Sequence, residues 1–143
     1  MASILRHATA VWTGSGKEGK GAITTESGVL EAVPYSFAKR FGEEKGTNPE
    51  ELIAAAHAGC FTMALAVQLS GAEHAPERLE TRADVSLTKE EGGWKIDAVM
   101  LQVKAKVPDI DAAKFNELAE KAKAGCPVSK LLNAKITLKA DLV

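Results

Sequence analysis

The chain has 143 residues and a mass of 15.1 kDa, enough for one domain with an ordinary hydrophobic core. Hydrophobic residues make up 45% and charged residues 26%, which excludes a disordered chain, and 18 basic against 19 acidic side chains exclude strong attraction to nucleic acid or anionic membranes. The first residues contain no apolar export segment, so we expect a cytoplasmic protein with reduced thiols.

The N-terminal part is predicted to form short strands separated by glycine-rich turns. Apolar and threonine-rich runs at residues 8–12 and 21–25 are typical of β-strands. In residues 34–41, aromatic side chains occupy alternate positions, which predicts a further strand that carries Arg40.

A long helix is predicted from Pro49 to about Leu69. The two polar residues before it can cap it, proline suits the first helical position, and two glutamates then complement the helix dipole. Residues 52–67 are apolar almost all round, which indicates a buried helix, and many are Ala or Gly, which lets another backbone approach closely. The apolar run is short and is interrupted by His57, so we do not expect it to span a membrane.

The C-terminal half is predicted to begin with a hairpin and to end with a strand. Residues 81–89 and 94–107 alternate with period two on either side of a glycine turn. Asp111 is expected to cap a helix that ends near residue 124. A short helix at 126–132 and a strand at 134–142 should follow.

These elements predict one α+β domain that covers residues 1–143. An antiparallel sheet would pack against the long buried helix at its centre. The sequence contains no internal repeat and no linker long enough to divide the chain.

Two cysteines, Cys60 in the long helix and Cys126 at the start of the short one, are the main chemical candidates. A reducing cytoplasm argues against a permanent disulfide, which leaves core thiols, metal ligands or a reversible redox pair. Only the thiolate form of a cysteine is a nucleophile, and an unperturbed thiol with a pKa of about 8.5 is only about 3% ionised at pH 7. Burial should raise the pKa of Cys60 further, so a nucleophile there needs a positive charge beside it.

Arg40 is the best placed of the four arginines to supply that charge, because it shortly precedes the Cys60 helix. Glu50, at the start of that helix, could orient the guanidinium through bidentate hydrogen bonds. Ten residues at about 1.5 Å rise place Glu50 roughly 15 Å from Cys60 along one helix. We therefore expect a second subunit to contribute Arg40 and Glu50, with the site at a twofold interface.

Local reasoning leaves the roles of the cysteines open. From the residues alone Cys126 is the better candidate for the attacking thiol, because a helix N-terminus lowers the pKa of a thiol. His57, Cys60 and Cys126 could supply three metal ligands, but no familiar zinc pattern completes them, so we expect a packed histidine, no metal and no cofactor. A non-enzymatic ligand module and a structural dimer with core cysteines remain alternatives, the second of which predicts sulfurs beyond disulfide reach.

Three segments in order resemble the OsmC/Ohr family of hydroperoxide reductases. They are residues 46–52 (Gly-Thr-Asn-Pro-Glu-Glu-Leu), 55–61 (Ala-Ala-His-Ala-Gly-Cys-Phe) and 123–129 (Lys-Ala-Gly-Cys-Pro-Val-Ser). The likeness covers essentially the whole chain. The short interval between Arg40 and the Asn-Pro-Glu motif is similar to the OsmC (osmotically inducible protein C) branch, whereas in the Ohr branch the arginine comes much earlier.

The resemblance implies an intertwined homodimer in which an antiparallel sheet wraps around a long buried central helix, with two sites at the subunit interface. It implies that the Cys60 thiolate attacks an organic hydroperoxide, giving an alcohol and a sulfenic acid, and that Cys126 converts the sulfenic acid to a disulfide. Arg40, oriented by Glu50, would stabilise the thiolate. A dithiol would reduce the disulfide, and in some family members this reductant is a lipoylated protein. The implied role is defence against oxidative stress.

Overall fold

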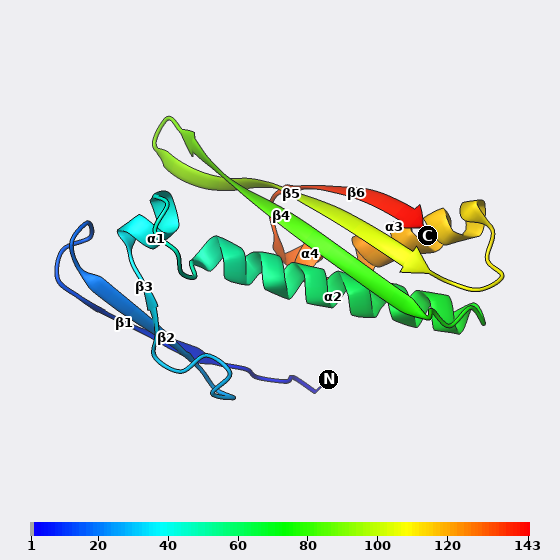
Figure 1. Ribbon diagram of the computed structural model, residues 1–143, viewed down its shortest axis with the longest axis horizontal. Coiled ribbons are helices and arrows are strands. Elements are labelled where there is room, and N and C mark those ends of the chain that lie inside the picture. The colour runs from blue at the N-terminus through cyan, green and yellow to red at the C-terminus, as the bar shows by residue number, and fades with distance from the viewer. Residues whose placement is uncertain (1) are drawn as a thin grey trace. The chain divides into compact units, whose positions relative to one another are not determined.

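The structure is a computed structural model that describes residues 2–143. The chain divides into an N-terminal unit, which ends at Pro49, and a C-terminal unit, Glu50–Val143, and each unit contains a three-stranded sheet (Figure 1). A single domain over residues 1–143 stays a prediction.

The N-terminal sheet is antiparallel, with the order β1-β2-β3. Its strands are β1 (Ala8–Thr13), β2 (Lys20–Thr25) and β3 (Val33–Tyr35). The strands predicted at 8–12 and 21–25 are therefore confirmed. Gly21 lies against the rings of Trp12 and Tyr35, and a Cβ atom at this position would clash with both, so only glycine lets the two aromatic residues close over the strand.

The strand predicted for residues 34–41 is wrong beyond Tyr35. Helix α1 (Phe37–Phe41) begins there instead. Ser36 is its N-cap, and the serine Oγ accepts a hydrogen bond from the backbone N–H of Lys39 at 3.2 Å. An N-cap serine stabilises a helix start by about 1 kcal/mol, which favours the helix over the strand in this segment.

The aromatic spacing that suggested a strand also fits one helical turn. Phe37 and Phe41 are four residues apart, and their ring centroids lie 4.8 Å from each other on α1. Arg40 consequently lies in the last turn of α1, with its guanidinium 5.1 Å from the centroid of the Phe41 ring.

The elements of the C-terminal unit follow the predicted order. They are α2 (Pro49–Gly71), β4 (Arg78–Glu90), β5 (Gly93–Lys106), α3 (Ala112–Gly125), α4 (Pro127–Leu131) and β6 (Lys135–Leu142). The predicted hairpin is confirmed as β4 and β5, which pair from Arg78 to Glu90 across a two-residue turn. The predicted cap is also confirmed, since Asp111 accepts a hydrogen bond from the N–H of Lys114 at 2.8 Å.

The C-terminal sheet is mixed rather than antiparallel. Its order is β4-β5-β6, and β6 runs parallel to β5, with Ala98 opposite Lys135 and Ala105 opposite Leu142. The sequence-based expectation of an antiparallel sheet is therefore wrong for this edge. The reason is the connection: α3 and α4 return the chain to the end of the sheet where β5 began, so the last strand repeats the direction of β5.

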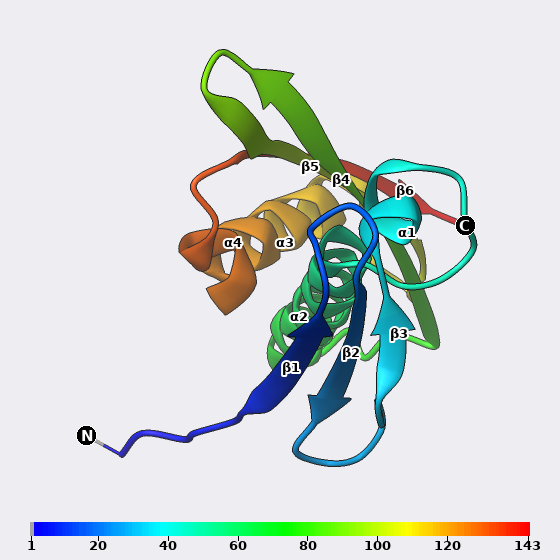
Figure 2. The same ribbon diagram turned by 90° about the vertical axis from the view of Figure 1, so that its left-hand side faces the viewer.

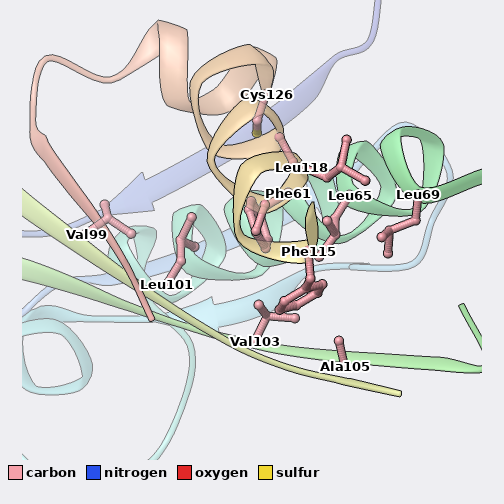
Figure 3. Packing of buried hydrophobic residues seen from close by; sticks show 12 residues of the cluster. Phe61, Leu65, Leu69, Val99, Leu101, Val103, Ala105, Phe115, Leu118 and Cys126 are labelled. Carbon is pink, nitrogen blue, oxygen red and sulfur yellow. The ribbon is translucent and has the colours of Figure 1, made fainter. Parts of the chain in front are cut away.

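The core of the C-terminal unit lies between this sheet and the two longer helices, α2 and α3 (Figures 2 and 3). One face of α2 contributes every fourth residue, and β5 contributes every second residue, as each periodicity requires. The buried apolar residues are Phe61, Leu65, Leu69, Val99, Leu101, Val103, Ala105, Phe115, Leu118, Ala119, Ala122 and Cys126. Each large side chain among them stabilises the fold by about 1.5–3 kcal/mol through burial.

The opposite face of α2 is apolar but exposed. Met63 is 71% exposed and Val67 is 64% exposed, and Gly59 lies on the same stripe one turn earlier. The sequence predicted that this helix is buried on all sides. Within one chain, only one face of α2 is buried. By length and a mean hydropathy of 1.7, α2 is the one helix among residues 2–143 that could cross a membrane, a test that core helices of soluble proteins also pass.

Candidate active site

The C-terminal unit brings together the two cysteines, which are 66 residues apart in sequence. Cys60 lies in the middle of α2, and Cys126 joins α3 to α4 as the C-cap of the first and the N-cap of the second. Both are free thiols, and a hydrogen bond joins their sulfurs at 2.8 Å. A disulfide could form here without a large movement of either helix, so the distance argues against the alternative in which the cysteines lie beyond disulfide reach.

The two thiols differ in exposure. Cys126 is fully buried in the core, at 0% exposure, whereas Cys60 is partly exposed and lines a cavity of about 350 Å³. The other residues that line this cavity are mostly apolar: Met63, Ala64, Val67, Gln68, Lys121, Ala122, Gly125 and Pro127. A small apolar molecule in the cavity would therefore meet the sulfur of Cys60 first.

The two thiols also differ in the direction of their pKa shifts. Burial raises the pKa of Cys60, the hydrogen bond with Cys126 raises it further, and a backbone hydrogen bond from Val128 only partly opposes these effects. Burial acts in the same direction on Cys126, but hydrogen bonds from Cys60 and from the N–H and hydroxyl of Ser129 outweigh it and lower its pKa. Either thiol can donate the hydrogen bond between the sulfurs.

The start of α4 lowers the pKa of the Cys126 thiol without a regular N-cap hydrogen bond. Cys126 is the N-cap residue of α4, yet its side chain accepts no regular capping hydrogen bond. The N–H groups of Val128 and Ser129 nevertheless lower the pKa of the Cys126 thiol, because their dipoles favour a negative sulfur. The local expectation that Cys126 is the more acidic thiol therefore agrees with the opposite directions in which the pKa values of the two thiols are shifted.

Arg40 and Glu50 lie in different units. Arg40 is in α1 of the N-terminal unit, and Glu50 is a buried residue, 8% exposed, in the first turn of α2. Because α2 is continuous from Pro49 to Gly71, ten residues of helix separate Glu50 from Cys60, roughly 15 Å. The contribution of Arg40 and Glu50 to the site stays a prediction.

A buried histidine and a serine adjoin the cysteine pair. His57 is 0% exposed, as expected of a packed residue, and its Nε2 lies 2.8 Å from the Oγ of Ser129. The other ring nitrogen, Nδ1, is buried and has no hydrogen-bond partner among the described residues. Burial lowers the pKa of His57, so its ring is neutral near pH 7.

Sequence reasoning did not assign a role to Ser129. The signal available was its spacing: it follows Cys126 by three residues, as Cys60 follows His57 by three, so each helix offers one cysteine and one hydrogen-bonding partner. Within residues 2–143, no three His, Cys, Asp or Glu side chains form a cluster able to hold a metal ion.

We expect the free energy of unfolding to fall as the pH drops below about 6.5, the ordinary pKa of histidine. The pKa of His57 is lower in the folded protein, so the unfolded chain binds more protons there, and stability present above pH 6.5 is lost on acidification. The loss has an upper limit of about 1.4 kcal/mol per pH unit. Urea unfolding at several pH values between 7.5 and 5.5 measures it. His57→Gln should flatten the dependence, and equal slopes in both proteins would contradict the prediction.

Comparisons with known proteins extend these observations. The chain is 51% identical over 140 residues to "Peroxiredoxin OsmC" of Escherichia coli, which covers 98% of both chains. It is 38% identical over 125 residues to "Organic hydroperoxide resistance protein OhrB" of Bacillus subtilis, covering 85% of this chain and 88% of that protein. The crystal structure of OhrB from Bacillus subtilis matches 96% of this chain and 98% of that one, with a TM-score of 0.70 and 33% identity.

The family comparison agrees with the resemblance read from the sequence. Residues 42–141 match the family described as "OsmC-like protein", a range that includes Glu50, His57 and both cysteines. This range is more than half of the chain, and the solved relatives share its mixed α+β fold. The chain therefore belongs to the OsmC-like protein family.

Proposed function

We propose that the chain is a thiol peroxidase that reduces organic hydroperoxides to alcohols in defence against oxidative stress. The observation that carries the proposal is the pair of free thiols, 2.8 Å apart, with one of them open to an apolar cavity. The names of the relatives, a peroxiredoxin and an organic hydroperoxide resistance protein, support the same activity.

The proposed attacking group is Cys60, because it is the thiol that a molecule in the cavity can reach. Its thiolate attacks the distal oxygen of the hydroperoxide, a sulfur–oxygen bond forms, and the oxygen–oxygen bond breaks. The leaving alkoxide takes up a proton and departs as the alcohol, while Cys60 is oxidised to the sulfenic acid. Arg40, oriented by Glu50, is proposed to offset the raised pKa of Cys60 and to polarise the peroxide.

Cys126 is proposed to complete the oxidative half of the cycle. Its sulfur attacks the sulfenic sulfur of Cys60, the hydroxyl group leaves as water after protonation, and a disulfide forms. The short distance between the sulfurs supports this step. An external dithiol then reduces the disulfide and becomes a disulfide itself. A lipoylated protein is the proposed reductant, because the lipoyl dithiol is carried on a slender apolar arm that suits the apolar cavity beside Cys60.

We propose that the active protein is an intertwined homodimer with two sites at its interface. Two observations support it. About 15 Å of helix separates Glu50 from Cys60 in one chain. Exposed Met63 and Val67 give α2 an apolar face that a second chain could cover. The proposed setting is the cytoplasm, where thiols are kept reduced, and the proposed organisation is a single OsmC-like domain.

Anaerobic titration of the reduced protein with cumene hydroperoxide tests the function. We expect two thiols per chain to disappear for each peroxide consumed, with the intramolecular disulfide as product. Free-thiol assay and mass spectrometry of the unreduced protein measure both quantities. Silent thiols together with stoichiometric zinc in the purified protein would instead support a non-enzymatic metal module.

A further inference from the structure

The cysteine pair is one side of a four-residue arrangement built by α2 and α4. His57 and Cys60 lie one turn apart on α2, and Cys126 and Ser129 lie one turn apart at the start of α4. Two contacts join the helices, Cys60 to Cys126 between the sulfurs and His57 to Ser129 between Nε2 and Oγ, each at 2.8 Å. Ser129 follows Cys126 by one helical turn, and its hydroxyl is among the groups that lower the pKa of the Cys126 thiol.

The protonation of His57 decides the direction of these hydrogen bonds. Its ring is fully buried and neutral, so only one of its nitrogens carries a proton. If that proton were on Nδ1, a buried N–H donor would have no partner among the described residues, which is rare and costly in folded proteins. With the proton on Nε2, His57 donates to the oxygen of Ser129, so the serine keeps its own proton for another acceptor, and Cys126 lies one helical turn away.

We propose that Ser129, held by His57, is a positioning residue that stabilises Cys126 as the thiolate leaving group when a dithiol reduces the Cys60–Cys126 disulfide. This inference deepens the proposed function and rests on it. A buried thiolate requires hydrogen-bond donors because no water reaches it, and Cys126 is 0% exposed. Ser129 supplies one such donor, its hydroxyl, which lowers the pKa of the Cys126 thiol.

The exposure of the two sulfurs assigns the leaving group. A thiolate of the reductant can reach Cys60, which lines the cavity, but not Cys126, which is in the core. It forms a bond to the sulfur of Cys60, and the sulfur–sulfur bond breaks with its electron pair passing to Cys126. The second thiol of the reductant then displaces Cys60, and the reductant departs as its own disulfide. A more stable leaving thiolate makes the first step faster.

Ser129→Ala tests this role by removing the hydroxyl and leaving the backbone unchanged. The disulfide is first formed with diamide, and its reduction by dithiothreitol is followed at pH 7. We expect about tenfold slower reduction than in the wild type, the effect of losing one hydrogen bond to a charged group. Ser129→Thr keeps the hydroxyl and should stay within about twofold of the wild type. Ser70→Ala, at an exposed serine at the end of α2, is the matched control.

A second measurement separates positioning from a general loss of structure. In a Cys60→Ser background, the ultraviolet absorbance of the thiolate reports the ionisation of Cys126 alone. Adding Ser129→Ala should raise the pKa of Cys126 by about one unit, and Ser129→Thr should restore it. His57→Leu should act like Ser129→Ala, and His57→Gln, which keeps a donor, should act like the wild type. If His57→Leu fails to fold, the comparison of Ser129→Ala with Ser129→Thr still tests the role of the serine hydroxyl.

Wild-type reduction rates and an unchanged Cys126 titration in Ser129→Ala would overturn the inference. Failure of the proposed function is a different result, in which wild-type thiols do not consume cumene hydroperoxide. Because diamide forms the disulfide without peroxide, the effect of Ser129 is measurable in either case.

Discussion

Replacing Cys60 by serine should lower the consumption of organic hydroperoxide by at least about a thousandfold. A serine hydroxyl has the size of the thiol but does not ionise near neutral pH, so no nucleophile remains at the cavity. The measurement is steady-state loss of cumene hydroperoxide with dithiothreitol as the reductant, at equal concentrations of folded protein.

Cys126→Ser is the matched variant, since it removes the other sulfur of the same pair. It should carry out one peroxide turnover and then accumulate the sulfenic acid of Cys60, which dimedone labels and excess peroxide overoxidises. The opposite pattern, an active Cys60→Ser protein and sulfenic acid on Cys126, would reverse the two roles. Such a reversal would agree with the lower pKa of Cys126 in the C-terminal unit.

Replacing Arg40 by methionine should slow the reaction of Cys60 with peroxide by about a hundredfold near pH 7. A guanidinium close to a thiolate shifts its pKa by about 1–3 units, and each unit lost is about a tenfold loss of thiolate. The defect should shrink as the pH rises, because the thiol of Cys60 then ionises without the cation. Stopped-flow measurement of peroxide reduction from pH 6 to 9.5 gives the profile. Arg82→Met is the control, since Arg82 pairs with Asp84 in β4.

The same variants can show whether one site is built from two chains. Co-expression of Arg40→Met with Cys60→Ser gives mixed dimers in which one of the two sites combines the intact Cys60 of one chain with the intact Arg40 of the other. Random pairing should then restore about a quarter of the wild-type activity. No recovery in purified mixed dimers would place Arg40 beside the cysteine of its own chain, and a monomer in solution would contradict the proposal of shared sites.

Local signals in the sequence were sufficient for most elements of the fold. The cap at Asp111 and the turn of the β4–β5 hairpin depend on neighbours within a few residues, and both were predicted. Residues 34–41 were misassigned because aromatic spacing fits a strand and a helical turn equally well, and the cap by Ser36 decides between them. The direction of β6 could not be predicted, since it depends on where α3 and α4 return the chain.

The site was only partly accessible to sequence reasoning. Each cysteine could be placed on its helix, but their approach to 2.8 Å depends on how α3 packs on α2, which no local pattern encodes. Among the sequence-based inferences, only the resemblance to a known family implied that Cys60 and Cys126 form a disulfide. The contact between His57 and Ser129 joins residues 72 positions apart, and the three-residue spacing of each from its cysteine does not show that the two helices meet. The role of Ser129 therefore depends on a contact in three dimensions rather than on a local pattern.

The parallel pairing of β6 with β5 has a consequence for the newborn protein. Cys60 emerges from the ribosome 66 residues before Cys126, and Cys126 lies in the crossover that connects β5 to β6. A nascent chain that ends before residue 126 contains one cysteine and can form no intramolecular disulfide. The contact between the two sulfurs can therefore form only late in translation, after α3 and the start of α4 have been synthesised.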